Sequence, residues 1–271
     1  GYQMDLTDNL FKSLRNIESL SILQKNVPVL FKVFKSLNDH VLSLGNLKEL
    51  DIPLGHLDDN ENDAKLILKI LADNLHNIQH LRLRFHYSAF YLFKNLDYFY
   101  NKLSSSKVES LSIQSKGVKI SDETIKILAK NYKNLKSLEY SFDHRCFDKV
   151  RLLLSNLNSS KIEKLKISLP FSSPGQIDWV YFAENIRNVK ELSITDCHIT
   201  LEDLETLLQI HPRLYLLDLS SAFLHVQDSV RFAEAINQTS IKHLTLKNNQ
   251  LNVNEVEERL KGKVTLTINK Q

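Results

Sequence analysis

One short stretch of the chain has residue types that could support covalent catalysis. Asp143, His144, Arg145 and Cys146 are consecutive, and a thiol, an imidazole and a carboxylate are the groups of a nucleophile–base set. Neighbours in sequence rarely converge on one reacting atom, and no glycine-rich loop accompanies them to donate hydrogen bonds to an oxyanion. We therefore expect no catalytic residue here, and we predict that the chain is not an enzyme.

The sequence also lacks the short motifs that mark common cofactor and metal sites. It has no Walker loop, no dinucleotide-binding glycine fingerprint, no paired-histidine zinc motif and no Gly-x-Ser-x-Gly elbow. Only 6 of the 271 residues are glycine, which leaves little room for a loop that cradles phosphate. We expect neither a cofactor nor a bound metal.

One cluster of basic and aromatic residues could bind an anion or form an interface hot spot. Its members are His80, Arg82, Arg84, Phe85, His86, Tyr87, Phe90, Tyr91 and Phe93. Arginine beside aromatic residues is typical of hot spots, and an acidic peptide or a phosphate could also bind there. In the interpretation that we favour, the aromatic residues fill the interior and the arginines pair with Asp51 and other acids.

The first members of this cluster, His80 and Arg82, lie within a phrase that recurs along the whole chain. The phrase is aliphatic-x-x-aliphatic-x-aliphatic, and its nine full copies begin at Ile17, Leu47, Ile78, Val108, Leu135, Ile162, Val189, Leu214 and Ile241. A degenerate tenth copy begins at Val264, and successive copies start 23 to 31 residues apart. A period of this length is the sequence signature of a solenoid.

The spacing inside the phrase predicts a strand with one apolar and one polar face. In the third copy Leu81 and Leu83 are two residues apart, so they point to the same side of a strand. His80, Arg82 and Arg84 then point to the opposite side. The other full copies have the same parity, so one face of every strand is expected to be buried.

A helical pattern follows most of these strands. Ser121 and Thr200 are predicted N-caps, with acids in the first turn where the helix dipole favours them, and Pro212 is expected to stop a helix. Apolar stripes of helical spacing run through Ala64–Leu75, Ala89–Leu103, Phe147–Leu157, Gln176–Ile186 and Asp228–Asn237.

Strand, loop and helix therefore make one repeating unit, and a single unit buries too little apolar surface to fold alone. Stacked units bury each other's faces. Strands stack about 4.8 Å apart whereas helices need about 10 Å, so strands are expected on the concave side and helices on the convex side. The predicted fold is an α/β solenoid of about nine to ten repeats.

This pattern resembles the leucine-rich-repeat superfamily, and its long repeats are most similar to the ribonuclease-inhibitor-like subgroup. The fullest matches to the longer family phrase continue into Cys197 and Ile199 after the seventh copy, and into Asn249 after the ninth. The resemblance implies that this Asn or Cys is buried and bonds the backbone of the next turn. It also implies a recognition surface, although the superfamily serves many unrelated functions.

The polar faces of the strands are the expected binding surface. The residues that we predict to contact a partner are Asp51, His80, Arg82, Arg84, Ser112, Glu139, Lys166, Ser193, Asp218 and Thr245. Charges of both signs are mixed among them, which favours a protein partner over nucleic acid, because nucleic acid requires one sign of charge.

Composition places few further limits on the chain. We expect a single solenoid domain over residues 1–271, with an N-terminal helix or cap in 1–16. There is no apolar run long enough to span a membrane, and two distant cysteines favour a reducing, cytoplasmic compartment. The last strand has no evident lid, so a partner or further sequence is expected to cover it.

Three functions remain open from the sequence. The first is an intracellular adaptor or scaffold arm, of which a ubiquitin-ligase substrate receptor is a special case. The second is a secreted effector of an intracellular microbe that binds a host protein, a source that the bias of 26 lysines to 9 arginines permits. The third is the recognition part of an enzyme whose catalytic domain lies outside these residues.

Overall fold

The computed structural model describes residues 18–21, 46–54, 61–85, 93–115, 120–142, 148–170 and 175–268. The chain divides into two compact units, Gly1–Leu135 and Lys136–Gln271, and each is described by itself. The predicted N-terminal helix, residues 86–91 of the basic and aromatic cluster, and the stretch Asp143–Cys146 lie outside the described residues. Within the described part of the chain, no helix is both long and apolar enough to cross a membrane.

The first unit alternates strands with helices in chain order. Its strands are β1 (Ser19–Ser21), β2 (Glu49–Leu54), β3 (His80–Phe85) and β4 (Ser110–Ser115). Its helices are α3 (Glu61–Asp73), α4 (Phe93–Leu103) and α5 (Asp122–Asn131). Each strand pairs in parallel with the next, so this part of the chain is a stack of strand–helix repeats.

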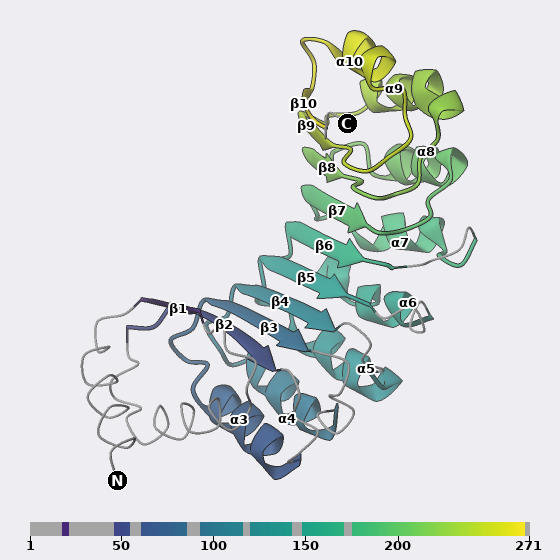
Figure 1. Ribbon diagram of the computed structural model, residues 1–271. Helices are drawn as coiled ribbons and strands as arrows, with labels where there is room; N and C mark the ends of the chain where they lie inside the picture. Colours follow the sequence, from purple (N-terminus) through teal and green to yellow (C-terminus); the bar gives the residue numbers. More distant parts are fainter. Residues whose placement is uncertain are drawn as a thin grey trace. The chain divides into compact units, whose positions relative to one another are not determined.

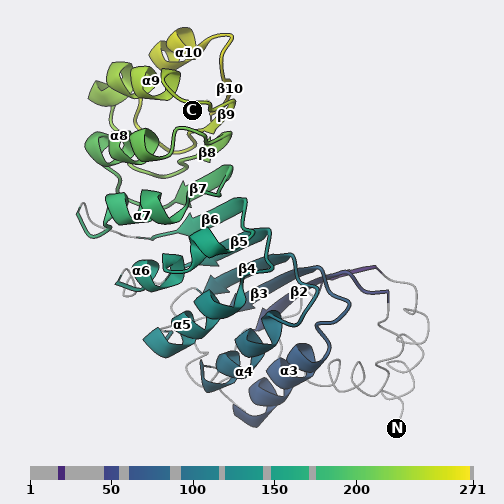
Figure 2. The same cartoon turned by 180° about the vertical axis from the view of Figure 1, so that it is seen from behind.

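The helices of the first unit cover one side of its strands. Figure 1 and the reverse view in Figure 2 both show α3, α4 and α5 on the same side, and α4 packs between the other two. The side chains of Leu50, Leu81 and Leu111 occupy matching register positions and are at most 4% exposed. The parity that the sequence predicts is therefore correct for these strands.

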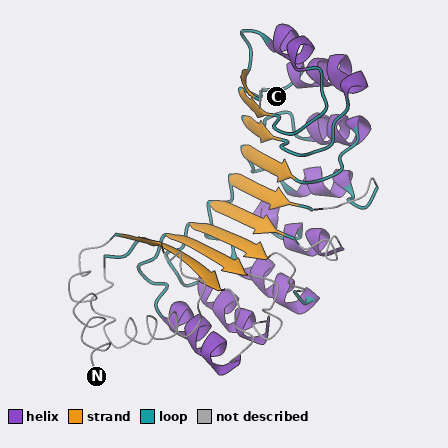
Figure 3. Ribbon diagram, viewed as in Figure 1, coloured by secondary structure: helices purple, strands orange, loops and turns teal. Residues whose placement is uncertain are grey.

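The second unit continues the same alternation with shorter strands. Its strands are β5 (Ser137–Ser141), β6 (Lys164–Ser168), β7 (Glu191–Thr195), β8 (Leu216–Asp218), β9 (His243–Thr245) and β10 (Thr265–Thr267). Its helices are α6 (Asp148–Leu154), α7 (Trp179–Asn185), α8 (Leu201–Ile210), α9 (Ser229–Asn237) and α10 (Val253–Leu260), with 3₁₀ turns η4 (Leu157–Ser159) and η5 (Val226–Asp228). Figure 3 shows the helices of this unit on one side of its strands.

A continuous ladder of aliphatic side chains forms the core of the second unit. Leu165, Leu192, Leu217 and Leu244 occupy matching register positions and are at most 1% exposed. Burying one such side chain contributes roughly 1.5–3 kcal/mol, and each of these leucines is covered by the repeats on both sides. Leu266 of β10 is only partly buried, because the described residues place a neighbouring strand on one side of it alone.

The predicted helix starts at Ser121 and Thr200 are confirmed. The Ser121 hydroxyl accepts a hydrogen bond from the backbone N–H of Thr124 at 3.1 Å, and Thr200 accepts one from Asp203 at 3.1 Å. A side chain in this position satisfies a backbone donor that has no partner within the helix. Helix α8 then ends at Ile210, two residues before Pro212, as its sequence predicts.

The Cys of the longer repeat phrase is buried as expected, whereas the Asn departs from the expectation in its burial and in the turn that it bonds. Cys197 is fully buried. Asn249 is half-buried, and its amide donates to the Leu219 carbonyl at 2.7 Å and accepts from the N–H groups of Ala222 and Leu224. Asn249 therefore bonds the preceding turn and not the next one, because its side chain points back along the stack.

Helix α10 is a further departure from the sequence prediction. No stripe was expected between Gln250 and Lys261, yet Val253–Leu260 is helical and buries Val256 and Leu260. Its N-cap is Asn252, whose side chain accepts from the backbone N–H of Glu255 at 3.4 Å. Acidic residues surround this short stripe, which obscures its periodicity.

Candidate functional site

In each unit, side chains of alternate strand residues point away from the helices and form what we call the open face. Within each unit, residues at matching register positions form one row of this face, the central row, and the two rows include eight of the predicted contact residues. In the first unit the central row is Ser21, Asp51, Arg82 and Ser112. In the second unit it is Glu139, Lys166, Ser193, Asp218, Thr245 and Thr267.

The open face of the first unit is cross-linked by charged groups. Arg84 donates from Nε to Oδ1 of Asp51 at 2.9 Å, and both side chains are only about a quarter exposed. The Ser21 hydroxyl donates to the other carboxylate oxygen at 3.4 Å. This pair confirms the expectation that an arginine of the basic cluster neutralises Asp51.

The remaining predicted residues of the first unit differ in accessibility. His80 and Arg82 are exposed, whereas Ser112 is only 7% exposed. Ser112 therefore faces the predicted side but offers little surface to a partner. Phe85 is 2% exposed, so this aromatic member of the cluster belongs to the core.

In the second unit, three ion pairs link neighbouring repeats, two of them on strands β5, β6 and β7 and one directly before β6 and β7. The central row pairs Lys166 with Glu139 at 2.9 Å, and the row before it pairs Lys164 with Glu191 at 2.9 Å. At the edge where the strands begin, Lys190 pairs with Glu163 at 2.7 Å. The charges of these strands therefore neutralise one another.

Asp218 on β8 is bonded differently from the acids of β5 to β7. Its Oδ2 atom accepts from the Ser193 hydroxyl at 3.0 Å, and its Oδ1 atom accepts from the N–H and hydroxyl of Ser220 at 2.9 and 2.6 Å. All three donors are neutral. Among the described residues Asp218 has no cationic partner, so its negative charge is fixed in position without being neutralised.

Apolar and aromatic side chains precede the level of Asp218 on β8 and β9. Leu216 lies in the row before the central row, where its second-unit counterparts are Ser137, Lys164, Glu191, His243 and Thr265. Tyr215 is 48% exposed, and its hydroxyl lies 2.9 Å from Nε2 of His243. The two rings meet edge to face with centroids 5.0 Å apart.

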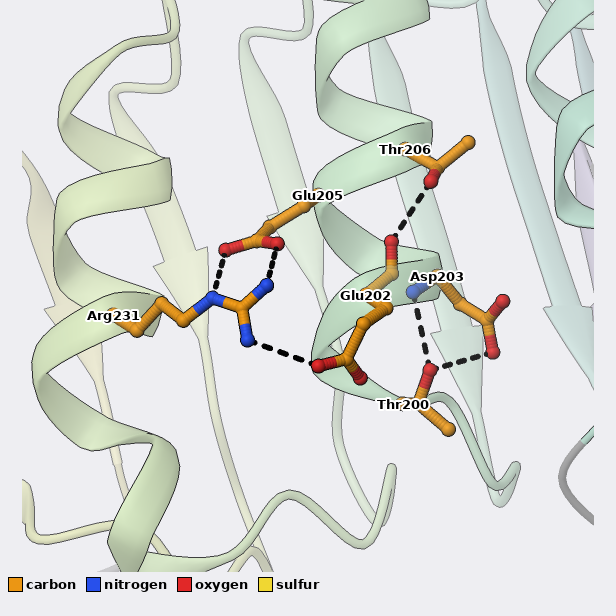
Figure 4. Close-up of polar contacts among 6 residues, drawn as sticks. All are labelled: Thr200, Glu202, Asp203, Glu205, Thr206 and Arg231. Carbon is orange, nitrogen blue, oxygen red and sulfur yellow. Dashed lines mark hydrogen bonds and ion pairs between the residues drawn. The ribbon is translucent and has the colours of Figure 1, made fainter.

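A second polar cluster lies on the helix side of the second unit (Figure 4). Arg231 of α9 donates from Nε to Glu205 at 2.7 Å and from Nη1 to Glu202 at 2.9 Å, both on α8, and a third bond joins Nη2 to Glu205. The hydrogen bonds to Glu205 and Glu202 raise the pKa of Arg231. Its guanidinium is thus occupied by its own chain, which leaves it poorly suited to capture an external carboxylate.

A groove of about 630 Å³ runs between α8 and α9 next to this cluster. Leu208, Pro212 and Arg231 are among the residues that line it, together with several glutamate and glutamine side chains. The groove is open and mixed in polarity, and it gives no position where reactive groups converge.

Cys197 is poorly suited to nucleophilic chemistry, and the described residues offer no metal-binding cluster. Burial raises the pKa of the Cys197 thiol to about 12, so this sulfur stays protonated near neutral pH and lies away from solvent. The described residues hold no group of three or more His, Cys, Asp or Glu side chains that could bind a metal ion.

The sequence analysis did not include Tyr215 or Leu216 among the predicted contact residues. Tyr215 stands directly before its strand, at the position where other repeats have Glu18, Lys48, Glu163 or Lys190. An exposed aromatic residue in a column of charges is a signal that the sequence does contain. It was overlooked because the repeat phrase draws attention to the aliphatic positions alone.

Comparison with known proteins supports the fold. No family model and no curated protein matches the chain. Among solved structures, the chain is similar to the leucine-rich repeat-containing protein LegL7 from Legionella pneumophila, with 16% identity and a TM-score of 0.55. This likeness covers 84% of this chain and 72% of LegL7.

Two further likenesses are too weak to carry an argument. One is to TLR13 in its complex with ssRNA13, with a TM-score of 0.40 and 16% identity over 79% of this chain and 38% of TLR13. The other is to a sugar phosphate isomerase/epimerase from Parabacteroides distasonis, with a TM-score of 0.29 and 16% identity over 83% and 94% of the two chains. The likeness to LegL7, together with the strand–helix repeats, shows an α/β leucine-rich-repeat solenoid fold.

Proposed function

We propose that this chain is a non-catalytic recognition module that binds a partner protein on the open face of its strands. The observation that supports this most strongly is the central row, in which residues such as Lys166, Ser193 and Asp218 are held in parallel register. The opposite face of the same strands is buried, so the backbone under this row is rigid. A rigid surface loses little conformational entropy when it binds.

The charges of the open face favour a protein over a nucleic acid. Nucleic-acid surfaces neutralise phosphates with lysine and arginine, and they need an excess of positive charge. Here Lys166, Lys164 and Lys190 are each paired with a glutamate of a neighbouring strand. Acids, bases, hydroxyl groups and an exposed aromatic ring together suit a protein surface of mixed composition.

Within this proposal, the role that we favour is an intracellular adaptor or scaffold arm. A ubiquitin-ligase substrate receptor, a microbial effector bound to a host protein, and the recognition part of a larger enzyme would use the same surface. They differ in the identity of the partner, which decides between them.

Affinity capture from source-cell lysate tests the proposal. The parent chain is compared with an open-face triple variant, Arg82→Glu, Glu139→Lys and Asp218→Lys. The matched control is Lys126→Glu, Glu184→Lys and Glu257→Lys, which makes the same charge changes at exposed helix positions. We expect one protein to be lost with the open-face variant and retained by the control.

The opposite pattern would move the binding surface to the helix side. Capture that disappears after ribonuclease treatment would replace the protein partner with RNA. Circular dichroism and thermal unfolding of both triple variants establish that each is folded before capture is compared.

A further inference from the structure

The open face of β8 and β9 carries a fixed carboxylate beside apolar and aromatic side chains. Asp218 accepts three hydrogen bonds from Ser193 and Ser220, and none of these donors is charged. A carboxylate has about four acceptor positions, so Oδ2, which takes one bond, retains room for another donor.

The equivalent acid in the first unit shows how such a carboxylate is neutralised within one chain. Asp51 occupies the central row of β2, and Arg84 from the neighbouring strand bonds it at 2.9 Å. On the strand after β8, Thr245 pairs with Asp218 as Arg82 pairs with Asp51, and Lys247, two residues later, has the position of Arg84. Lys247 is exposed, and among the described residues the hydrogen-bond partners of Asp218 are Ser193 and Ser220, not Lys247.

The surroundings of Asp218 suit the aliphatic part of a long basic side chain. Leu216 is on the same face two residues earlier, a distance of roughly 7 Å along the strand. His243 lies beside Leu216 in register, and Tyr215 directly precedes Leu216, with nearly half of the Tyr215 side chain exposed. Lysine and arginine bury an apolar stem while their charged end stays polar, and arginine also stacks on aromatic rings.

The nearby cation Lys242 does not occupy this position. It precedes Thr245 by three residues, roughly 10 Å along the strand, and so lies at the edge where β9 begins. On β8 and β9 the central row consists of Asp218 and Thr245, so Asp218 is the charged residue of this part of the row.

We propose that the open face of β8 and β9 binds a basic peptide segment of the partner. An arginine or lysine of that segment pairs with Asp218, and its stem and an adjacent apolar residue cover Leu216 and Tyr215. This inference rests on the proposed function, since it assigns the chemistry of the partner and the part of the open face that it contacts.

A displayed library of random dodecapeptides is the probe. Binding peptides are selected from this library in four separate experiments, on the parent chain and on the variants Asp218→Asn, Thr245→Arg and Glu257→Gln. Thr245→Arg places a cation next to Asp218, at the position that Arg82 has beside Asp51, and it removes no hydrogen bond of Asp218. Glu257→Gln makes the same acid-to-amide change as Asp218→Asn at an exposed position on α10.

We expect the parent and Glu257→Gln to select peptides with arginine or lysine next to an apolar residue. Asp218→Asn and Thr245→Arg should lose that preference, and the best peptide should bind each of them at least about tenfold more weakly. Thermal unfolding of each variant shows that it is folded, and Thr245→Arg keeps the test valid if Asp218→Asn is unstable.

Selection without a basic preference, equal selection on Thr245→Arg, or no selection at all would overturn this inference. The proposed function fails separately, when lysate capture is unaffected by the open-face triple variant. Peptides that lack basic residues but require the open face would leave the proposed function intact and reject Asp218 as the contact for a cation.

Discussion

The open face of β5–β7 and the open face of β8–β9 rest on the same core but differ in how their polar groups are satisfied. On β5–β7, acids and lysines pair across neighbouring strands, as Glu139 does with Lys166. On β8–β9, Asp218 is held by neutral donors and lies beside Leu216 and the Tyr215–His243 pair. A face that satisfies its own charges gains little from a partner, whereas an unneutralised carboxylate beside apolar surface gains more.

The first prediction concerns the core that both regions share. Leu192 is fully buried between β6 and β8, so Leu192→Asp places a charge where no partner exists. We expect a loss of at least about 3 kcal/mol in the free energy of unfolding, enough to unfold much of the second unit. Urea unfolding followed by circular dichroism measures this loss.

The control for Leu192 is its neighbour on the opposite face. Glu191→Ala removes a partly exposed ion pair with Lys164 and should change the free energy of unfolding by no more than about 1 kcal/mol. Parent-like melting of Leu192→Asp would show that the strand register is wrong.

The second prediction separates the two regions by their contribution to binding. Tyr215→Ala should weaken a bound peptide or partner by about 2 kcal/mol, because exposed tyrosines are typical hot spots. The double variant Lys164→Met and Glu191→Gln removes a paired charge of β6–β7 and should cost less than about 0.5 kcal/mol of binding free energy. Isothermal titration calorimetry with the selected peptide compares them, and a reversed order would reject the contrast between the regions.

The third prediction uses pH to weaken the chain immediately before β8. His211 is buried after the end of α8, and its Nε2 lies 2.7 Å from the Val189 carbonyl. Burial lowers the pKa of His211, although bonds to the Val189 and Ile186 carbonyls partly oppose the shift. The unfolded chain therefore binds the proton more readily than the folded chain. The free energy of unfolding keeps its full value above the ordinary pKa of about 6.5 and falls as pH drops below it.

Thermal unfolding between pH 7.5 and 5 measures this effect as a fall in Tm. His211→Gln keeps an N–H donor but cannot be protonated, so it should show a smaller fall over the same range. Equal falls in the two proteins would mean that other groups determine the acid sensitivity.

The smallest expected effect is in the paired charges of β5–β6. The Lys166 side chain is 50% exposed and that of Glu139 is 15% exposed, so Lys166→Glu should cost about 0.5 kcal/mol of stability through like-charge contact, and Glu139→Lys somewhat more. The double swap should restore most of that loss. Unfolding at low and high salt checks both points, because salt screens a surface pair. If the stability losses of the two single variants simply add in the double variant, the pair contributes nothing.

Much of the fold could be predicted because each repeat carries its own local signals. The spacing of Leu81 and Leu83 gave the buried face, and Ser121 and Thr200 gave the helix starts. Helix α10 was missed because Val256 and Leu260 are few apolar residues among many acids. A short stripe of this kind is stabilised by packing on its neighbour α9, which the local sequence does not reveal.

The candidate site was less predictable than the fold. Parity gives the side to which a residue points, but it does not give how far neighbouring side chains cover it, as Ser112 shows. The repeat phrase also cannot tell which acids meet a cation, because Asp51 and Asp218 occupy equivalent positions with different partners. Such differences depend on pairs of residues from adjacent repeats, some 25 to 33 positions apart in sequence.

The most direct test of open-face recognition is photo-crosslinking to the protein captured from lysate. The photoreactive residue p-benzoylphenylalanine replaces Lys166 or Thr245 on the open face, and Val180 or Glu257 on the helix side, all in the second unit. Open-face recognition predicts covalent adducts from Lys166 and Thr245 and none from Val180 or Glu257. Adducts from the helix positions alone would contradict it.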